Sequence, residues 1–393
     1  MKYTLNPELP LVGLLVLDFS QYLAGPSCAL RLADLGADVV KVERPNGGDQ
    51  CRSLMLANQT LDSDSALFHT INRRKRSFAA DLKQPSDLAR VRALVAQADV
   101  MIHNFRPGVM QRLGLDYDSV AELNPRIVYG AVTGYGEAGP WRDKPGQDLL
   151  VQSLSGLAWL SGNAGEEGNQ PPVPAGVSVI DVITGAHLVQ GILAALLRRS
   201  TSGRGGRVDV SLLESAIDLQ FEPFTAFLNS DRSQPERTAQ NHASVHGAAP
   251  YGIYRTQDGF MALAMTPMDQ LAALIQSPAL AQLAADRTQW FNQRNALKAQ
   301  LQHDLLQHGT AHWLELLERE DIWCANVLDW PQLTAHPAFE ALEMTQTIRS
   351  ASGATLQTTR CPIRLDGQRL TSEQGAPALG ADTQAIARQY ALP

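Results

Sequence analysis

Asp181 is the residue of this sequence best suited to covalent chemistry. It follows an apolar run over 174–180 and opens a stretch in which apolar side chains recur at helical spacing as far as Arg198, so the sequence predicts that it lies at the start of a helix. An aspartate there can cap the helix by accepting a backbone N–H. The partial positive charge of a helix start also favours an ionised carboxylate, which is a usable nucleophile on an exposed turn. The local sequence permits both roles.

Basic residues gather where a phosphorylated ligand would need them. Arg44 follows a predicted strand over 37–43, and Arg106 and Arg112 follow another over 99–103. Because ligands of open α/β sheets bind outside the carboxyl ends of the strands, these arginines suit a ligand with several phosphates. The alternative is an ordinary solvated surface.

Other nucleotide and metal chemistries are not indicated. Gly25 precedes a predicted helix and Glu43 ends the next strand, as in a dinucleotide-binding fold, but the turn over 24–28 holds one glycine followed by proline instead of the glycine-rich fingerprint. The sequence has no Walker-type phosphate loop, no zinc signature and no serine-hydrolase elbow. The four cysteines are widely scattered, so we expect reduced thiols and no metal site.

The elements expected to position these residues alternate between strands and helices. The pattern predicts strands over 14–19, 37–43, 99–103 and 126–132 and helices over 27–35, 65–72 and 87–97. Such alternation favours an α/β fold with a doubly wound, parallel, Rossmann-like sheet.

The length of 393 residues favours two domains. The polar stretch 230–240 has the composition of a linker, and a hairpin is expected around Asp258 and Gly259. We predict three ranges on this basis: a large Rossmann-like domain over 1–229, a linker and smaller α+β domain over 230–330, and a C-terminal part over 331–393 that returns to the large domain.

The charge and hydropathy of the chain limit its partners. The sequence has 33 Lys and Arg against 40 Asp and Glu, a net charge of −7, so no general field draws it to nucleic acid or to an anionic membrane. No apolar run reaches the ~20 residues of a membrane span, and the first residues lack the apolar segment of a signal peptide. We expect a cytoplasmic protein that binds neither nucleic acid nor membrane.

A series of ordered motifs resembles one family. After the Ala-Gly-Pro turn at 24–26 and the segment 35–49, the motifs follow at 72–77, 104–108, 134–140, 203–211, 362–364 and 379–380. Over nearly its whole length the chain is similar to the family III CoA-transferases of the CaiB/BaiF type, typified by formyl-CoA transferase and the carnitine CoA-transferases. Asp181 falls where this family has its nucleophile.

The resemblance implies transfer of coenzyme A between acids. Asp181 would attack an acyl-CoA thioester to give a mixed anhydride and then an aspartyl-CoA thioester, from which CoA passes to a carboxylic acid acceptor. CoA is then a substrate, and no permanent cofactor or metal is implied. The resemblance assigns the CoA contacts to Arg44, Lys75, Asn104, Phe105, Arg106, Arg112 and Lys144.

Two departures from formyl-CoA transferase affect the acid pocket. Leu23 stands where that enzyme has a glutamine, and the segment around Gly247 stands where it has a run of glycines that closes over the site. We therefore expect an acceptor other than formate or oxalate, larger or less polar, with Gln21, Tyr22 and Gln147 also near its pocket.

Two rival functions are considered beside CoA transfer. An α-methylacyl-CoA racemase of the same fold uses a histidine with the aspartate to move an α-proton, but the matching triplet over 146–148 is Gly-Gln-Asp, and glutamine takes no proton near neutral pH. A CoA-binding protein without catalysis would lack Asp181. The resemblance also implies an interlocked homodimer, in which each chain passes through the opening between the other's two domains.

Overall fold

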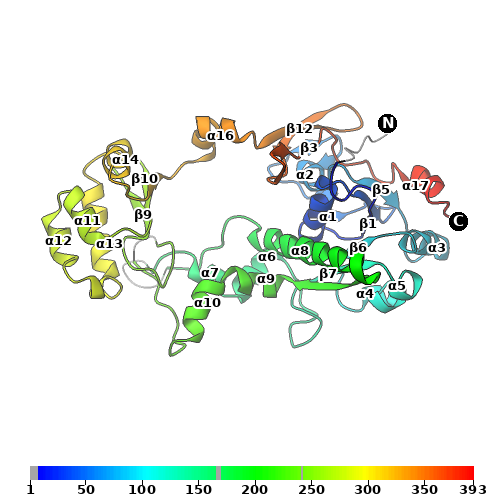
Figure 1. The fold of residues 1–393 in the computed structure, drawn as a ribbon, viewed down its shortest axis with the longest axis horizontal. Helices are drawn as coiled ribbons and strands as arrows, with labels where there is room; N and C mark the ends of the chain where they lie inside the picture. The colour runs from blue at the N-terminus through cyan, green and yellow to red at the C-terminus, as the bar shows by residue number, and fades with distance from the viewer. Residues whose placement is uncertain (1–7, 165–169, 240–241) are drawn as a thin grey trace. The chain divides into compact units, whose positions relative to one another are not determined.

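The computed structural model describes residues 8–164, 170–239 and 242–393 (Figure 1). The chain forms two compact units. The first unit contains Met1–Val151, Ser178–Ala216 and Glu340–Pro393, and the second contains Gln152–Val177 and Ile217–Phe339. These bounds differ from the predicted ranges, because 152–177 and 217–229 pack with the second unit and the chain re-enters the first unit at Glu340.

A six-stranded sheet forms the centre of the first unit. Its strands are, in spatial order, β5 (Arg76–Ala79), β2 (Asp38–Glu43), β1 (Leu15–Asp18), β6 (Val100–His103), β7 (Val128–Thr133) and β8 (Gly206–Ser211). Every neighbouring pair is parallel. The order reverses between β1 and β6, as it does in doubly wound sheets. The predicted α/β fold with a parallel sheet is confirmed.

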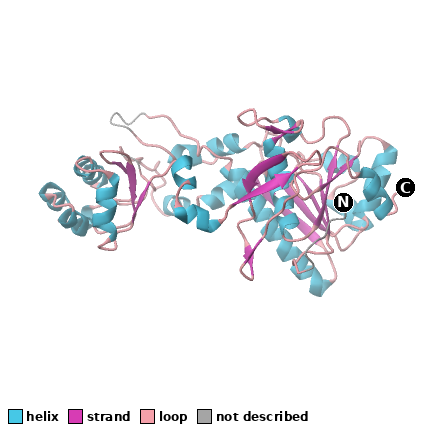
Figure 2. Ribbon diagram, turned by 90° about the horizontal axis from the view of Figure 1, so that it is seen from above, coloured by secondary structure: helices cyan, strands magenta, loops and turns pink. Residues whose placement is uncertain are grey.

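Helices cover both faces of this sheet (Figure 2). On one face, α1 (Ala24–Asp34) lies beside α8 (Val179–Ser202), and Leu188 and Ile192 of α8 pack over Gly130 of β7. On the other face, apolar side chains of the strands share one buried core with α3 (Pro85–Val95), α5 (Tyr117–Leu123) and α17 (Thr383–Gln389). Strands buried on both faces read as continuous apolar runs, which is why the sequence predicts most of them.

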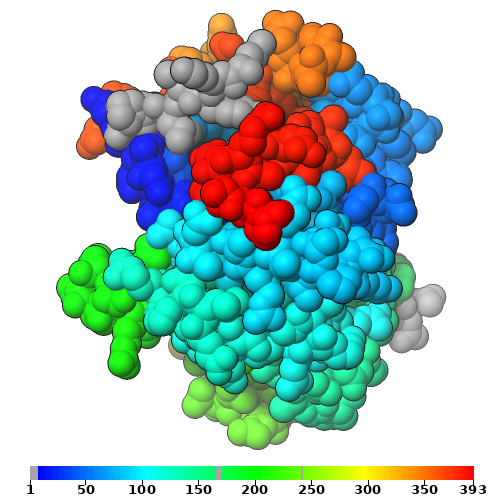
Figure 3. All heavy atoms as spheres, turned by 90° about the vertical axis from the view of Figure 1, so that its right-hand side faces the viewer, coloured from blue at the N-terminus to red at the C-terminus, as the bar shows by residue number. Residues whose placement is uncertain are grey.

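Sequence patterns do not predict β5 and β8. β5 has four residues within a basic segment, and β8 is an edge strand in which buried and exposed residues alternate. The other elements of the first unit are short: η1 (Gln50–Ser53), β3 (Thr60–Leu61), β4 (Asp64–Ser65), α2 (Ala66–Asn72), α4 (Val109–Leu113), β12 (Thr345–Arg349), β13 (Thr355–Thr359), β14 (Arg364–Leu365) and β15 (Gln368–Arg369). The C-terminal segment, red in Figure 3, ends with α17 seated on the same unit.

The second unit has an antiparallel sheet in the order β11 (Cys324–Asn326), β10 (Phe260–Leu263), β9 (Gly252–Arg255). β9 and β10 form the predicted hairpin around Asp258 and Gly259. Its core forms around Tyr254, Met261 and Trp313. The helices are α7 (Leu157–Leu160), α10 (Phe221–Leu228), α11 (Met268–Leu274), α12 (Pro278–Leu283), η2 (Arg287–Gln289), α13 (Arg294–Leu305), α14 (Thr310–Glu318) and α15 (Trp330–Thr334), while α6 (Asp148–Leu154), α9 (Leu212–Leu219) and α16 (Pro337–Leu342) join the units along the chain.

Helix α8 departs from the expectation that no segment is long and apolar enough to cross a membrane. It has 24 residues and meets that test by length and composition, because small residues join the aliphatic ones in one uninterrupted helix. One of its faces packs on β7 and α1 as described. On another, Val182 and Leu197 are 58% and 73% exposed. The helix is thus a layer of the first unit that also presents an apolar surface.

Candidate active site at the start of helix α8

Asp181 lies in the first turn of α8, which begins after Ser178. The Ser178 side chain makes no capping hydrogen bond. Instead, one carboxylate oxygen of Asp148, the first residue of α6, accepts the backbone N–H groups of Ile180 and Asp181 at 2.8 and 2.9 Å. The capping role considered for Asp181 therefore belongs to Asp148.

The Asp181 carboxylate itself is left unbonded. No hydrogen bond or ion pair reaches it from residues 8–164, 170–239 or 242–393. Burial, together with the negative charge of Asp148, raises the pKa of Asp181 to about 7. An unbonded carboxylate of raised basicity is, once ionised, a stronger nucleophile than an ordinary surface aspartate.

The fold puts this first turn at the carboxyl edge of the parallel sheet. The chain leaves β7 at Thr133 and enters the parallel strand β8 at Gly206, and α8 makes the return crossing between them. Its first turn therefore lies near the strand ends and its last turn near the strand starts. The loops after β1 and β6 border the crevice in which ligands of such sheets bind, because the strand order reverses there.

Asn104 ties the loop after β1 to the loop after β6. Its side-chain amide donates to the Gln21 carbonyl at 2.7 Å, and its oxygen accepts the Gln21 N–H at 2.9 Å. Tyr22 follows with a φ of 64°, and its N–H donates to Asp49 at 3.2 Å. The structure thus brings Gln21, Tyr22 and Asn104 together at the crevice, with the Asn104 amide bonded to backbone at both ends.

The first turns of α8 lie against the start of α1. A Cβ at Gly185 would be 2.8 Å from the Ala24 carbonyl oxygen and 2.2 Å from Ser27 Oγ, so this approach requires glycine. Asp181 precedes Gly185 by one helical turn and lies on the same face of α8. Asp181 and the 21–23 turn, which leads directly into α1, are therefore neighbours.

Lys75 is placed differently from the prediction. It has no exposed surface, and its ammonium group donates to Asp18 at 2.8 Å, to the Pro26 carbonyl at 3.0 Å and to Asn72 Oδ1 at 2.8 Å. An ammonium group buried and bonded in this way does not reach a phosphate, so the expected contact between Lys75 and CoA has no support in this geometry. By its composition alone, the basic run 72–76 would be interpreted as a solvated surface. The burial of Lys75 shows that this interpretation does not hold for that residue.

Lys75 belongs to a buried charge cluster with Asp18, Lys41 and Asp49. Lys41 contacts Asp49 at 2.8 Å, the Ser20 carbonyl at 2.8 Å and Asp18 at 3.8 Å. Burial acts to raise the pKa of Asp18, but Lys41 and Lys75 together lower it to about 2. Asp18 therefore stays ionised, and the bonds within the buried charge cluster fix the end of β1 and the turn that follows.

Four other predicted CoA contacts are exposed cations. Arg44 follows β2, Arg106 follows β6, Arg112 lies in α4, and the Lys144 ammonium is 5.7 Å from the centre of the Trp141 ring. Arg44 comes directly after β2, and Arg106 lies in the loop that follows β6, so both are at the carboxyl edge. Exposed cations at strand ends suit a phosphate ligand.

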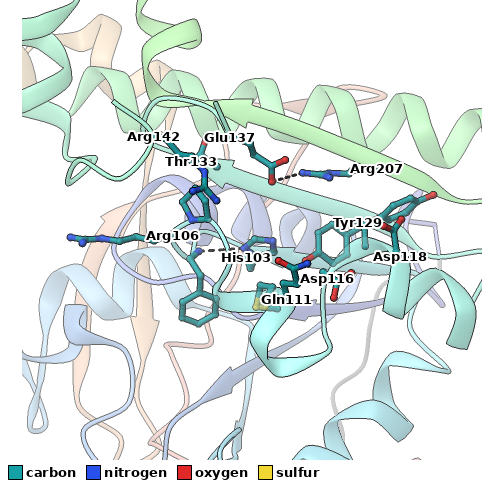
Figure 4. A pocket seen from close by; sticks show the side chains of 15 residues that line it. His103, Arg106, Gln111, Asp116, Asp118, Tyr129, Thr133, Glu137, Arg142 and Arg207 are labelled. Carbon is teal, nitrogen blue, oxygen red and sulfur yellow. Dashed lines mark hydrogen bonds and ion pairs between the residues drawn. The ribbon is translucent and has the colours of Figure 1, made fainter. Parts of the chain in front are cut away.

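A cavity of about 280 Å³ adjoins Phe105 and Arg106 (Figure 4). It lies on the face of the sheet covered by α5, opposite α8, so Asp181 does not line it. Tyr117 and Tyr129 form part of its wall, and their rings meet edge to face. The cavity combines flat apolar surfaces with the exposed guanidinium groups of Arg106, Arg142 and Arg207.

Besides His103, Gln111 and Thr133, six charged side chains line this cavity: Arg106, Asp116, Asp118, Glu137, Arg142 and Arg207. Burial and the charge of Arg207 lower the pKa of His103 to about 4, so its ring is neutral. His103 Nδ1 accepts the Phe105 N–H at 3.3 Å, so the ring proton is on Nε2. Arg207 pairs with Glu137 at 2.5 Å, while Arg142 lines the same wall.

The remaining predicted pocket residues have different surroundings. Leu23 ends the turn before α1. Gln147 is exposed and directly precedes Asp148, so it lies beside the residue that caps α8. Gly247 belongs to the second unit, where its N–H donates to the Ser244 carbonyl at 3.1 Å. A place for Gly247 near Asp181 stays a prediction.

Sequence patterns do not single out Asp148, Gly185, Asp18 or Lys41. A glycine one turn after the candidate nucleophile, inside a long helical pattern, is a signal of close backbone approach. A charged residue inside an apolar strand, as at Asp18 and Lys41, signals a buried ion pair. Asp148 carries no local signal, because it caps a helix 33 residues further along.

Comparison with known proteins gives the family context of this site. A model of the family described as CoA-transferase family III matches residues 11–383. The chain is 32% identical to a succinate–glutarate CoA-transferase of Agrobacterium fabrum, over 95% of this chain and 94% of the relative, and 30% identical to an acetyl-CoA:oxalate CoA-transferase of Acetobacter aceti, over 99% and 97%. Its fold is similar to the crystal structure of a CAIB/BAIF family protein from Brucella suis, with a TM-score of 0.80, 30% identity and coverage of 97% and 99%.

The raised pKa of Asp181 predicts that Asp181→Asn stabilises the protein in a pH-dependent way. From about pH 4 to about pH 7 the folded state holds the Asp181 proton more tightly than the unfolded chain, so the wild type loses stability as pH rises through this window. The asparagine variant escapes that loss. We expect its melting temperature to exceed the wild-type value by a few degrees at pH 8 and by less at pH 5. Asp143→Asn, with a side chain 80% exposed, is the control; a pH-independent gain in Asp181→Asn would contradict the raised pKa.

The structure also predicts that Lys75 and Arg112 act differently. Lys75→Met leaves Asp18 with a buried, poorly compensated charge and should lower the free energy of unfolding by ~3–5 kcal/mol. Arg112→Ala should change stability by less than about 0.5 kcal/mol but weaken CoA binding by ~1–3 kcal/mol. Urea unfolding and titration calorimetry measure the two effects. A stable Lys75→Met variant with weakened CoA affinity would restore Lys75 as a phosphate ligand.

Proposed function

Because the chain belongs to CoA-transferase family III, we propose that it transfers CoA from an acyl-CoA thioester to a carboxylic acid through covalent intermediates on Asp181. One observation carries the assignment of the nucleophile: the Asp181 carboxylate is part-buried and unbonded among the described residues, in a helix start at the carboxyl edge of the sheet. A carboxylate with only a structural role is normally hydrogen-bonded when it is buried.

The reaction needs no group beyond this carboxylate to form and break its bonds. An Asp181 oxygen attacks the thioester carbonyl, a C–O bond forms and the C–S bond breaks, giving a mixed anhydride and CoA thiolate. The thiolate attacks the aspartyl carbonyl and expels the donor acid as its carboxylate. The acceptor carboxylate then repeats these two steps in reverse order, and Asp181 leaves as a carboxylate. No net proton transfer occurs.

Several exposed residues support a binding surface for the nucleotide end of CoA. Arg44, Arg106, Arg112 and Lys144 are cations suited to phosphate. Phe105 and the adjoining cavity offer flat apolar surface suited to a purine ring. Asn104 acts in this proposal by holding the 21–23 turn, because its amide is bonded to Gln21.

The acid substrates bind, in this proposal, between Asp181 and the turn formed by Gln21, Tyr22 and Leu23, with Gln147 also near the pocket. The relatives are named for succinate with glutarate and for acetyl-CoA with oxalate, so the first substrates to test are succinyl-CoA and acetyl-CoA as donors with short dicarboxylates as acceptors.

The four cysteines are free thiols, which supports a reducing, cytoplasmic location.

Racemisation of an acyl-CoA is the rival reaction of this fold. It needs a second base on the opposite side of the α-carbon from Asp181. By the resemblance, Gln147 stands where the racemase has its histidine, and an amide does not accept a proton near neutral pH. CoA transfer needs no such base, so the residues favour transfer.

We also propose that the protein is a homodimer. The exposed apolar residues of α8, Val182 and Leu197, support an interface on that helix, because a monomer would leave this surface in water. Sedimentation velocity at low micromolar concentration should give about twice the chain mass of 42.7 kDa. If the two chains are interlocked, labelled and unlabelled dimers should not exchange subunits without unfolding. A folded monomer at this concentration would contradict the proposal.

Substitution of Asp181 tests the reaction. Asp181→Asn keeps size and hydrogen bonding but removes the nucleophile, so CoA affinity should survive while transfer falls by several orders of magnitude. Asp181→Glu moves the attacking oxygen by about 1 Å and should lose ~100-fold in rate. The measurement is formation of the acceptor's CoA thioester, followed by mass spectrometry.

Hydroxylamine added during turnover identifies the intermediate. It should trap the activated aspartyl carbonyl as a hydroxamate on the peptide that contains Asp181, and on no other peptide. A label on another carboxylate, or near wild-type transfer by Asp181→Asn, would disprove the assignment. Deuterium from solvent appearing at the α-carbon of a 2-methylacyl-CoA at turnover rates, without an acceptor, would support racemisation instead.

A further inference from the structure

We propose that Asp148 is a positioning residue that keeps the Asp181 carboxylate unbonded and basic by taking the N–H groups at the start of α8 for itself. One Asp148 oxygen accepts the N–H of Ile180 at 2.8 Å and that of Asp181 at 2.9 Å. The inference rests on the proposed role of Asp181 as nucleophile and adds a residue that the mechanism above does not use.

The helix start itself creates the need for such a residue. The first N–H groups of an α-helix have no partner within the helix, and an acidic side chain in the first turn is a usual acceptor for them. Asp181 has this location, and Ser178 offers no capping bond that would compete with it. A carboxylate that accepted these N–H groups would be stabilised as the anion and would be a weaker nucleophile. Asp148 prevents this stabilisation, because its own carboxylate accepts the N–H groups of Ile180 and Asp181.

The charge of Asp148 adds a second effect. Among the charged groups in the described part of the chain, only Asp148 contributes to the raised pKa of Asp181, and its effect adds to that of burial. The titratable or charged residues on α8 and on the elements packed against it are otherwise His187, Arg198, Arg199, Arg31, Asp34, Arg207, Asp209, Glu214 and Asp218. A neutral side chain at position 148 would keep a cap but lose this repulsion.

The backbone just before Asp148 holds this residue in place through a close contact between two glycines. A Cβ at Gly146 would be 2.6 Å from the Gly134 Cα, and one at Gly134 would be 2.8 Å from the Gly146 Cα. The two segments therefore touch through their backbones, which ties Asp148 to the end of β7 and so to the carboxyl edge of the sheet. Side chains at either glycine would push the cap away from α8.

The test compares Asp148→Asn, Asp148→Glu and Asp148→Ala with Asp329→Asn. Asp329 caps α15 in the second unit by accepting the Gln332 N–H at 2.8 Å, so it is a matched cap. The first measurement is the pH profile of kcat/KM, whose acid limb reports the pKa of the free enzyme's essential carboxylate. The second is the gain in melting temperature when Asp181→Asn is added to each variant, which reports the same ionisation without any turnover.

We expect the acid limb of Asp148→Asn to move to lower pH by about 1 unit, with a roughly 3- to 10-fold lower rate on the plateau because the nucleophile is less basic. In this background Asp181→Asn should add less stability at pH 8 than it adds to the wild type. Asp148→Ala should lose more rate, about 10- to 100-fold, and Asp148→Glu should restore the wild-type limb in part. Asp329→Asn should leave the limb unchanged.

An unchanged acid limb and an unchanged stability gain in Asp148→Asn would overturn the proposal, even if the variant were less stable, because a purely structural cap predicts only the loss of stability. Failure of the proposed function is separately visible, since hydroxylamine would then not label Asp181 in the wild-type enzyme. Labelled Asp181 with an unchanged Asp148→Asn profile rejects the role of Asp148 alone. If Asp148→Ala does not fold, Asp148→Asn still decides the question.

Discussion

The buried charge cluster of Asp18, Lys41, Asp49 and Lys75 is the constraint on which the rest of the first unit depends. Asp18 ends β1, Lys41 lies beside it in β2, and Lys75 directly precedes β5. Charges taken out of water are tolerated only with close partners, so these groups hold neighbouring segments at fixed positions. The turn 21–23 follows closely after Asp18 in the chain, so the cluster restricts it to one conformation. The hydrogen bonds from Asn104 to Gln21 hold the turn further.

The start of α8 depends in turn on that fixed turn. α1 begins where the turn ends, and Gly185 lets α8 approach the Ala24 carbonyl more closely than any other residue would. Two helix starts therefore lie together at the carboxyl edge, where N–H groups are plentiful. Such an edge normally stabilises anions, which is useful for binding acids and unhelpful for keeping a carboxylate reactive. Because the first N–H groups of α8 donate to Asp148, they do not stabilise the Asp181 carboxylate, which can stay reactive while the edge still binds acids.

The sequence predicts the parts of this arrangement that depend on local pattern. Apolar runs identify β1, β2, β6 and β7, and helical spacing after Asp181 identifies α8. β5 and β8 are missed because one is short and basic and the other is a half-exposed edge strand. The contact between Lys75 and CoA that the resemblance implies has no support in the structure, because the Lys75 ammonium group pairs with Asp18, 57 residues away, and no local pattern reveals that pairing. Asp148 is missed for the same reason, since its partners are distant along the chain.

The raised pKa of Asp181 has opposite effects on the two halves of the proposed reaction. In the first mixed anhydride, thiolate attack on the aspartyl carbonyl expels the donor acid, a carboxylate of ordinary basicity, whereas attack on the donor carbonyl expels the more basic Asp181. The weaker base leaves more readily, so CoA is captured on the enzyme. In the second anhydride the same difference disfavours release of CoA to the acceptor. The aspartyl-CoA thioester is therefore the intermediate that should accumulate between the two acids, and the charge of Asp148 helps to set how long CoA stays there.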